Sequence, residues 1–248
     1  MSAPVRSSQA ISVMVTAMNE EGNLQAVIDN VLAAVDPRFD DYEVWILDDG
    51  STDRTSEIAD RLAAQNPRVF VHHNRINRGL GYSYRKGFEL SRKPLTMCVA
   101  SNNIISLKTM QDLCDQAGAA DLVFGNMVSD VRKLNRRLIS RTFANVLNVL
   151  FSVRLRYYTG PWICKTTVLR SLRTISEGSM IMPELPLRII KGGYSYLEID
   201  YHPQPRTTGK TKTFRLSNIV FVLVSIARLF WDIRVRGSVK SGMKRHAS

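Results

Sequence analysis

Short apolar runs alternate with segments of helical periodicity through the first half of the chain. Each run is only a few residues long and is ended by turn residues, which is typical of a strand buried inside a parallel sheet. The predicted strands are residues 11–16, 44–47, 69–71, 95–100 and 122–124. The predicted helices are residues 24–35, 55–65, 82–90 and 106–117. Because strands that alternate with helices form a parallel sheet through right-handed crossovers, the sequence predicts an α/β fold.

Acidic and amide side chains gather where three of these strands end. Asp48 and Asp49 directly follow the strand at 44–47, and the loops at 17–23 and 101–105 follow two others. Ligands of open α/β sheets bind at the carboxyl ends of the strands, so these loops are expected to form one site. Two adjacent carboxylates repel each other and need donors nearby, such as a ribose, a base N–H, a cation or an arginine. On this stretch alone, the alternative is a turn that merely caps the next helix.

The second half of the chain is more basic. Residues 132–141 hold five basic side chains at the start of a predicted helix, and Arg136 and Ser140 lie four residues apart on one face of it. A basic, glycine-bearing loop covers residues 203–213, and a long apolar helix is predicted at 216–231. Further predicted elements are a strand at 162–165, a helix at 181–191 and a strand at 194–201.

The net charge and the cysteine content indicate the kind of partner and the cellular compartment to expect. The 248 residues carry a formal net charge of +12, which suggests an anionic partner: a phosphate-bearing substrate, an anionic lipid surface or nucleic acid. The three cysteines are far apart and show no metal or disulfide spacing, as expected in a reducing cytosol. Residues 1–9 are polar and do not read as a secretory signal.

The predicted organisation has four parts. They are a flexible N-terminus at 1–10, an α/β domain at 11–215, an amphipathic helix at 216–233 and a basic tail at 234–248. The apolar part of the helix is roughly 14 residues long, shorter than the roughly 20 residues that cross a bilayer. Two interpretations of this helix stay open: a core helix packed on the sheet, or an interfacial helix on an anionic membrane.

Six short motifs occur in order along residues 11–215. They are Thr16-Ala17-Met18-Asn19-Glu20-Glu21, Asp48-Asp49-Gly50-Ser51-Thr52-Asp53-Arg54-Thr55, Asn77-Arg78-Gly79-Leu80-Gly81, Arg136-Arg137-Leu138-Ile139-Ser140, Thr159-Gly160 and Arg206-Thr207-Thr208-Gly209-Lys210-Thr211-Lys212. Together they resemble the inverting family 2 glycosyltransferases of the GT-A fold, and most of all the polyprenyl-phosphate sugar synthases of the dolichyl-phosphate mannose synthase type. The chain departs from that pattern at Thr16 and Met18, where the family has proline and tyrosine.

The resemblance implies where a nucleotide sugar binds. The implied nucleotide-binding residues are Thr16, Ala17, Asn19, Glu20, Asp48, Asp49, Gly79 and Asn102. It also implies a divalent cation, Mg²⁺ or Mn²⁺, at an acidic motif after the fourth strand, but here that stretch reads Ser101-Asn102-Asn103. A hard cation prefers carboxylate oxygens, and a carboxamide supplies no negative charge. Three interpretations follow: Asn102 and the diphosphate hold the ion weakly, basic side chains replace it, or activity is lost.

The resemblance further implies catalytic residues and a reaction. Arg136 and Ser140 are expected to clamp the acceptor phosphate, and Arg206, Lys210 and Lys212 to close over the diphosphate. The expected activity is transfer of a hexose from a nucleotide sugar of the GDP-mannose or UDP-glucose type to polyprenyl phosphate, with inversion. Such an enzyme would serve cell-envelope polysaccharide synthesis as a peripheral protein on the cytoplasmic face of a membrane, without a nucleic-acid partner. The alternatives are a glycan acceptor or a pseudoenzyme that binds nucleotide sugar.

Overall fold

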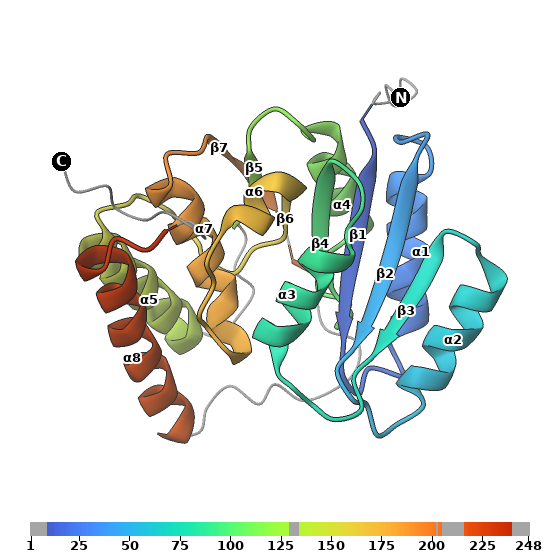
Figure 1. Ribbon diagram of the computed structural model, residues 1–248, viewed down its shortest axis with the longest axis horizontal. Helices are drawn as coiled ribbons and strands as arrows, with labels where there is room; N and C mark the ends of the chain where they lie inside the picture. The colour runs from blue at the N-terminus through green and yellow to red at the C-terminus, as the bar shows by residue number, and fades with distance from the viewer. Residues whose placement is uncertain (1–8, 129–133, 202, 205–215, 240–248) are drawn as a thin grey trace.

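A seven-stranded sheet runs through the molecule in the order β3-β2-β1-β4-β6-β5-β7 (Figure 1). The computed structural model describes residues 9–128, 134–201, 203–204 and 216–239. The strands are β1 Ile11–Ala17, β2 Tyr42–Asp48, β3 Val69–His73, β4 Leu95–Ala100, β5 Leu122–Met127, β6 Trp162–Lys165 and β7 Tyr196–Tyr201. Only β6 runs against its neighbours β4 and β5, so the sheet is mostly parallel. The predicted α/β fold is confirmed.

The helices match the predicted ones closely. They are α1 Leu24–Val35, α2 Thr55–Gln65, α3 Leu80–Leu90, α4 Leu107–Asp115, α5 Leu134–Phe151, α6 Thr166–Ser171, α7 Ile181–Lys191 and α8 Leu216–Phe230. A 3₁₀ turn at Gly178–Met180 and a π-helical turn at Trp231–Val235 complete the described elements. Helix α4 begins one residue later than predicted because Ser106 is its N-cap and accepts a hydrogen bond from the Thr109 N–H. Six residues are too few to show helical periodicity, so α6 was not predicted.

Strand alternation divides the core between the two faces of the sheet. Val13 and Val15 of β1 lie in one apolar cluster with residues of α1, α2 and α4, whereas Met14 lies in another with residues of α3, α6 and α7. Successive strand side chains point to opposite faces, which explains the division. Figure 1 shows α3 in front of the sheet and α1 behind it. The three cysteines are buried and unbridged, and burial raises the pKa of Cys98 to about 12.

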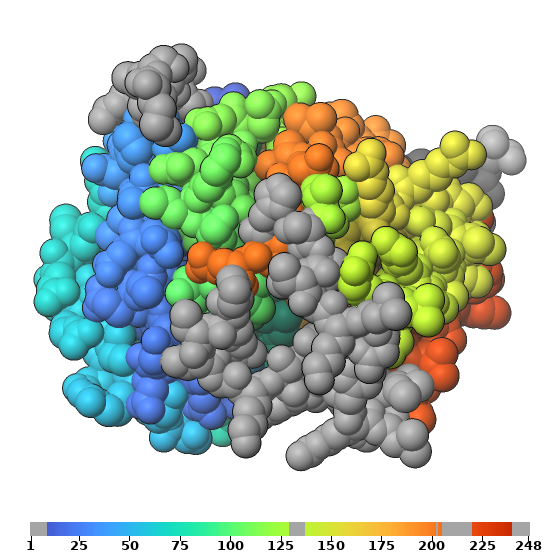
Figure 2. All heavy atoms as spheres, turned by 180° about the vertical axis from the view of Figure 1, so that it is seen from behind, coloured from blue at the N-terminus to red at the C-terminus, as the bar shows by residue number. Residues whose placement is uncertain are grey.

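A third apolar cluster joins α5, α7 and α8 at one end of the molecule. It contains Leu147 and Phe151 of α5, Leu187 of α7, and Ile226 and Leu229 of α8. Figure 2 shows the yellow-green α5 near the red α8, at the end opposite the blue and cyan α1 and α2. One side of α8 is therefore buried, as the first interpretation expects, but it packs on α5 and α7 and not on the sheet.

A buried ionic network connects α7 to the turn that follows α8. The guanidinium of Arg188 is fully buried and lies 2.5 Å from a Glu184 carboxylate oxygen and 2.7 Å from Asp232. It also donates to the Ser238 carbonyl. Glu184 in turn accepts a hydrogen bond from the backbone N–H of Ser176 at 2.7 Å. Because each charge has a partner, the desolvation of these groups is compensated, and the network fixes α8 to the rest of the fold.

Candidate functional site

The carboxyl ends of the parallel strands meet at one edge of the sheet. Ala17 of β1 pairs with Asp48 of β2, Thr16 pairs with Ala100 of β4, and Asp48 pairs with His73 of β3. The loops after these four strands therefore start side by side. The sequence predicted that three of them converge, and the register confirms this. It adds a fourth, the loop at 74–79, which contains Gly79.

Hydrogen bonds connect the loop after β1 to the loop after β2. The Asn19 N–H donates to Ser51 Oγ at 3.0 Å, and Asn19 Oδ1 accepts from the Thr52 N–H at 2.8 Å. The Glu20 N–H donates to Thr55 Oγ1 at 2.8 Å. Asn19 has a φ of 53°, a left-handed conformation that asparagine tolerates better than most residues. The two loops thus form one wall, and the Asn19 side chain is part of its framework.

Asp48 is buried against the start of α2 and the end of β3. One carboxylate oxygen accepts from the Ser51 N–H at 3.1 Å, and the other from Ser56 Oγ at 2.5 Å. That second oxygen also lies 2.9 Å from Nδ1 of His73, whose Nε2 lies 2.9 Å from Asp60. Burial raises the pKa of Asp48, but its hydrogen bonds outweigh this and hold the pKa below its ordinary value. Asp48 is thus a charged anchor inside the wall.

Asp49 holds the loop that follows β3. It is 6% exposed. Its Oδ1 accepts from Asn74 Nδ2 at 2.8 Å and from the Arg78 N–H at 2.9 Å, and its Oδ2 accepts from the Gly79 N–H at 2.8 Å. Gly79 has a φ of 84°, which favours glycine there. The two adjacent carboxylates therefore avoid repulsion by facing different sets of donors, a framework role that the sequence reasoning missed.

The turn after β4 carries amides in place of carboxylates. Asn102 Oδ1 accepts from the Ile104 N–H at 3.3 Å. The Asn103 carbonyl and Oδ1 accept from Gln204 Nε2 at 2.7 and 3.0 Å, and the Gln204 N–H donates to the Ile104 carbonyl at 2.9 Å. Gln204, which comes two residues before Arg206 in the sequence, is thereby attached to this turn. No local sequence pattern indicates a contact between residues so far apart in the chain, so the sequence did not predict the role of Gln204.

The donor set of this turn does not fit a divalent-ion site. Its amide oxygens already accept hydrogen bonds from the protein, and Ser101-Asn102-Asn103 offers no carboxylate. Within the residues that the structure describes, no three His, Cys, Asp or Glu side chains come together as a group that could hold a metal ion. The chemistry proposed below therefore uses no metal-dependent step.

The expected catalytic residues lie partly outside the described structure. Ser140 lies on α5 and is partly buried. The side chain of Arg136, on the first turn of α5, lies outside the described residues, as do Arg206, Lys210 and Lys212. The structure thus brings together the residues expected at the nucleotide, while the expected cations remain predictions.

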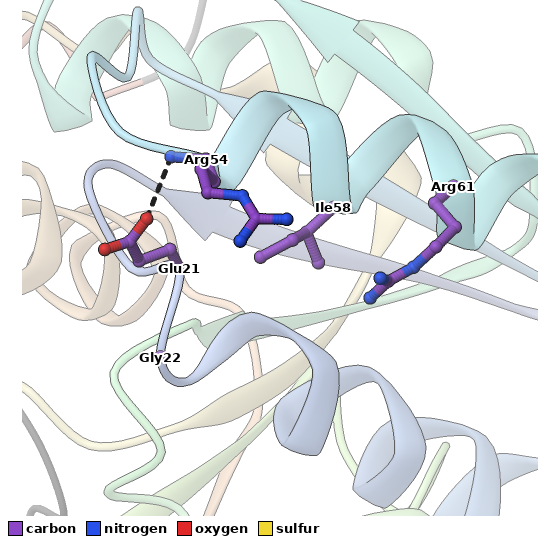
Figure 3. A pocket seen from close by; sticks show the side chains of 5 residues that line it. All are labelled: Glu21, Gly22, Arg54, Ile58 and Arg61. Carbon is purple, nitrogen blue, oxygen red and sulfur yellow. Dashed lines mark hydrogen bonds between the residues drawn. The ribbon is translucent and has the colours of Figure 1, made fainter.

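A small hollow lies on the outer side of the first loop (Figure 3). It has a volume of about 300 Å³ and is lined by Glu21, Gly22, Arg54, Ile58 and Arg61. Glu21 accepts a hydrogen bond from the Arg54 N–H at 3.1 Å, which adds a further link between the two loops. None of the residues predicted to bind nucleotide lines this hollow.

The segment from 174 to 178 covers the start of α3, next to Gly79. The Ser176 carbonyl accepts from Arg85 Nη1 at 3.0 Å, and a Cβ on Gly81 would lie 2.3 Å from the same oxygen. Gly81 therefore permits a close approach that a larger residue would prevent. Through Glu184, this segment links the loop held by Asp49 to the buried Arg188. The spacing of Glu184 and Arg188, four residues apart on a helix, is the only sequence signal for that network.

Comparison with known proteins assigns the fold and the family. The profile of glycosyl transferase family 2 matches residues 12–171. Polyprenol monophosphomannose synthase of Mycolicibacterium smegmatis is 29% identical over 98% of this chain and 94% of its own length. Glycosyltransferase AglD of Haloferax volcanii is 24% identical over 91% of this chain, which spans only 38% of that protein.

The solved structures share the arrangement of the sheet and helices. Glucosyl-3-phosphoglycerate synthase of Mycobacterium tuberculosis, in complex with Mn²⁺, UDP and phosphoglyceric acid, superposes with a TM-score of 0.70. It is 18% identical, and the match covers 90% of this chain and 79% of that one. The fold is thus GT-A-like, and the predicted family is confirmed. The chain belongs to the family 2 glycosyltransferases and is an enzyme of that family.

Proposed function

We propose that this enzyme transfers a hexose from a nucleotide sugar to a polyprenyl phosphate, with inversion at the anomeric carbon. The sheet edge supports the first half of the proposal, because four loops that carry amide and carboxylate groups converge there. The relative from M. smegmatis, which by its name makes polyprenol monophosphomannose, supports the second half because it aligns along nearly its whole length. GDP-mannose and UDP-glucose are the donor types to test first.

The proposed reaction needs no protein base. A phosphate monoester of a polyprenol is already an anion, so its oxygen attacks the anomeric carbon directly. A new carbon–oxygen bond forms on one face of the sugar as the bond to the nucleoside diphosphate breaks on the other. The enzyme must bring two anions together and stabilise the negative charge on the leaving diphosphate. Positioning and positive charge therefore carry the catalysis.

Each predicted site residue has a role in this proposal. The residues proposed to line the nucleotide site are Thr16, Ala17, Asn19, Glu20, Asp48, Asp49, Gly79 and Asn102. The two aspartates act there through the loop wall that they hold, and the backbone of Gly79 borders the same site. Arg136 and Ser140 are proposed to hold the acceptor phosphate, because an arginine fork matches two phosphate oxygens.

The basic segment is proposed to neutralise the leaving diphosphate. Arg206, Lys210 and Lys212 follow Gln204 in the sequence, and Gln204 is bonded to the turn at Asn103. Arg206 is the second residue after Gln204 in the sequence. The amide turn lacks a carboxylate for a cation, and in this proposal the basic side chains of the segment supply the missing positive charge in place of the cation.

Separate measurements of donor binding and of hexose transfer test the two halves of the proposal, the nucleotide-sugar donor and the polyprenyl-phosphate acceptor. A thermal-shift screen of nucleoside diphosphates and their sugars identifies the base, and calorimetry then measures the affinity. Arg136→Ala is expected to keep the affinity for nucleotide sugar within about twofold and to lower transfer by about a hundredfold, the loss of one charge-assisted phosphate contact. Unaltered transfer by this variant would remove Arg136 from the acceptor site.

A further inference from the structure

Helix α8 and the first residue of the π-helical turn after it carry a row of exposed apolar side chains on the side that faces away from the protein core. Val220, Leu223, Val224 and Trp231 are 59%, 61%, 45% and 55% exposed. Their spacing of three, four and eleven residues from the first places them on one side of a helix. Exposed apolar residues at helical spacing on a surface helix mark an interaction site. We call these four residues the outer row of α8.

The opposite side of the same helix is already covered. Ile226 and Leu229 are buried in the cluster that joins α5, α7 and α8. The helix is thus apolar on two sides, and the protein buries only one of them. A core helix needs one apolar side, so packing within the described residues does not explain the outer row.

Charge is distributed very unevenly along the sequence. The segments 131–176 and 201–248, which contain α5, β6, α6 and α8, together hold 20 of the 34 basic residues but only one of the 22 acidic ones. The remaining chain, with 14 basic and 21 acidic residues, has a net negative charge. The one acidic residue is Asp232, which is buried against Arg188. Arg228, between Val224 and Trp231, is exposed, and so are Arg234 and Arg236 after the outer row.

These two properties together favour one kind of partner. A second copy of the chain would bring like charges together, which opposes self-association. A nucleic acid would match the charge but would leave the outer row in water. An anionic bilayer satisfies both, because its interface accepts apolar side chains and Trp while its headgroups attract arginine. Among the described residues, no helix is long and apolar enough to cross a membrane.

We infer that the outer row of α8 docks the enzyme on the interfacial region of an anionic lipid bilayer. The helix lies along the surface with Val220, Leu223, Val224 and Trp231 among the acyl chains and the neighbouring arginines at the headgroups. This inference rests on the proposed function in one respect: it brings the acceptor end of the enzyme to the membrane that holds a polyprenyl phosphate. The network from Asp232 through Arg188 to Glu184 fixes the docked helix to the catalytic domain.

Flotation of the full chain with vesicles tests this inference without donor or acceptor substrate. The protein is expected to float with phosphatidylglycerol–phosphatidylcholine vesicles and to bind pure phosphatidylcholine vesicles at least about tenfold more weakly. Raising the salt concentration should reduce binding to the anionic vesicles, because screening weakens the attraction of exposed arginines. Equal binding to both vesicle types, or no binding to either at low salt, would overturn the inference.

A matched pair of variants localises the contact. Leu223→Asp places a carboxylate in the outer row and is expected to weaken vesicle binding by about tenfold or more, since burial of a leucine contributes that much. Tyr196→Asp introduces the same charge at an exposed position on β7 and is expected to leave binding within about twofold. Thermal melting and nucleotide affinity should be unchanged in both, which shows that each variant is folded. Equal loss in the two variants would contradict a contact at α8.

Four further outcomes decide between partners and between proposals. A dimer in sedimentation equilibrium that Leu223→Asp dissociates, without vesicle binding, would assign the outer row to a second copy and overturn the inference. Displacement from vesicles by single-stranded DNA with no effect of Leu223→Asp would also overturn it. Vesicle binding without any transfer of hexose would reject the proposed function and leave the docking surface supported. Transfer to a short, water-soluble polyprenyl phosphate without vesicle binding would support the proposed function and overturn the docking surface.

Discussion

The sheet edge and the α5–α8 end of this glycosyltransferase satisfy their polar and apolar groups in opposite ways. At the sheet edge, both oxygens of Asp48 and of Asp49 accept hydrogen bonds from the protein, and the loops bond to one another. At the other end, Leu223 is 61% and Val149 is 79% exposed, and cations outnumber carboxylates. The polar groups of the first region are already hydrogen-bonded within the protein, whereas the second region exposes apolar side chains to water.

This difference matches the two partners that the proposed reaction requires. A nucleotide sugar is a small polar ligand, and a rigid wall of backbone and carboxylate groups can orient it at low entropic cost. A lipid phosphate comes with a bilayer, which offers apolar and anionic surface over a large area. The buried Glu184–Arg188–Asp232 network lies between the two regions and holds their relative position.

The largest expected effect comes from breaking that connection. Arg188→Met leaves Glu184 and Asp232 as buried carboxylates without their partner, which should lower the free energy of unfolding by about 3–5 kcal/mol. Urea denaturation measures this loss. Arg173→Met, at an exposed arginine that contacts Ser238, is the control and should cost less than about 1 kcal/mol. Similar costs for the two variants would mean that the network does not fix α8 to the domain.

The next effect concerns the wall of the nucleotide site. Asp49→Ala removes the acceptor of three hydrogen bonds, including those from the Arg78 and Gly79 N–H groups, and frees the loop at 74–79. Nucleotide-sugar affinity in calorimetry should fall about a hundredfold, because hydrogen bonds to a charged group contribute about 1.5–3 kcal/mol each. Asp49→Asn retains one acceptor oxygen, so its nucleotide-sugar affinity should fall less than that of the alanine variant. Full affinity in the alanine variant would show that the loop is not part of the nucleotide site.

A smaller effect depends on pH through His73. Burial lowers the pKa of His73, but Asp60 and Asp48 more than offset this and raise the pKa above its ordinary value. Protonated His73 donates to both carboxylates, so its stabilisation is complete below the unfolded pKa of about 6.5 and is lost as the pH rises through the higher folded pKa. The free energy of unfolding of the wild type should exceed that of His73→Gln by about 1 kcal/mol at pH 6. This difference should shrink toward alkaline pH.

Chemical denaturation of both proteins between pH 6 and pH 9 measures that difference. Asp60→Asn is the matched variant, because it removes only the exposed partner of His73. It should show a smaller pH dependence than wild type. A difference that grows with pH would reverse the sign of the coupling and contradict the bridged arrangement.

The smallest expected effect concerns the amide turn. Asn102→Asp introduces a carboxylate after β4 and should increase the stimulation of transfer by Mn²⁺ by a few-fold, because hard cations prefer carboxylate oxygens. Transfer rates measured across a Mn²⁺ titration, with chelator-treated enzyme as the baseline, test this. An unchanged response to Mn²⁺ would show that position 102 does not face the diphosphate.

Most of the fold follows from the sequence, because strand and helix periods differ and turn residues separate them. The limits of the elements were harder to predict where a polar residue is buried. Strand β2 begins at Tyr42 rather than at 44 because the polar Glu43 is inside, held by Ser12 and Arg92. No periodic pattern marks a carboxylate that is buried with its partners.

The site was predictable as a place and less so as a set of contacts. Local sequence puts Asp48 and Asp49 at a strand end, but some of the groups that hold them come from residues 25 and 30 positions away, such as His73 and Gly79. The attachment of Gln204 to Asn103 spans 101 residues and has no local signature. Contacts of that kind depend on how the elements fold together, which a one-dimensional pattern does not record.

The most direct test of the account is transfer of labelled hexose from GDP-mannose and UDP-glucose into polyprenyl phosphate held in anionic vesicles. The account predicts a lipid-extractable product from one of these donors with wild type, and about a hundredfold less with Arg136→Ala although that variant still binds the donor. Donor turnover that places the label in a glycan or in free sugar, with none in the lipid fraction, would contradict it.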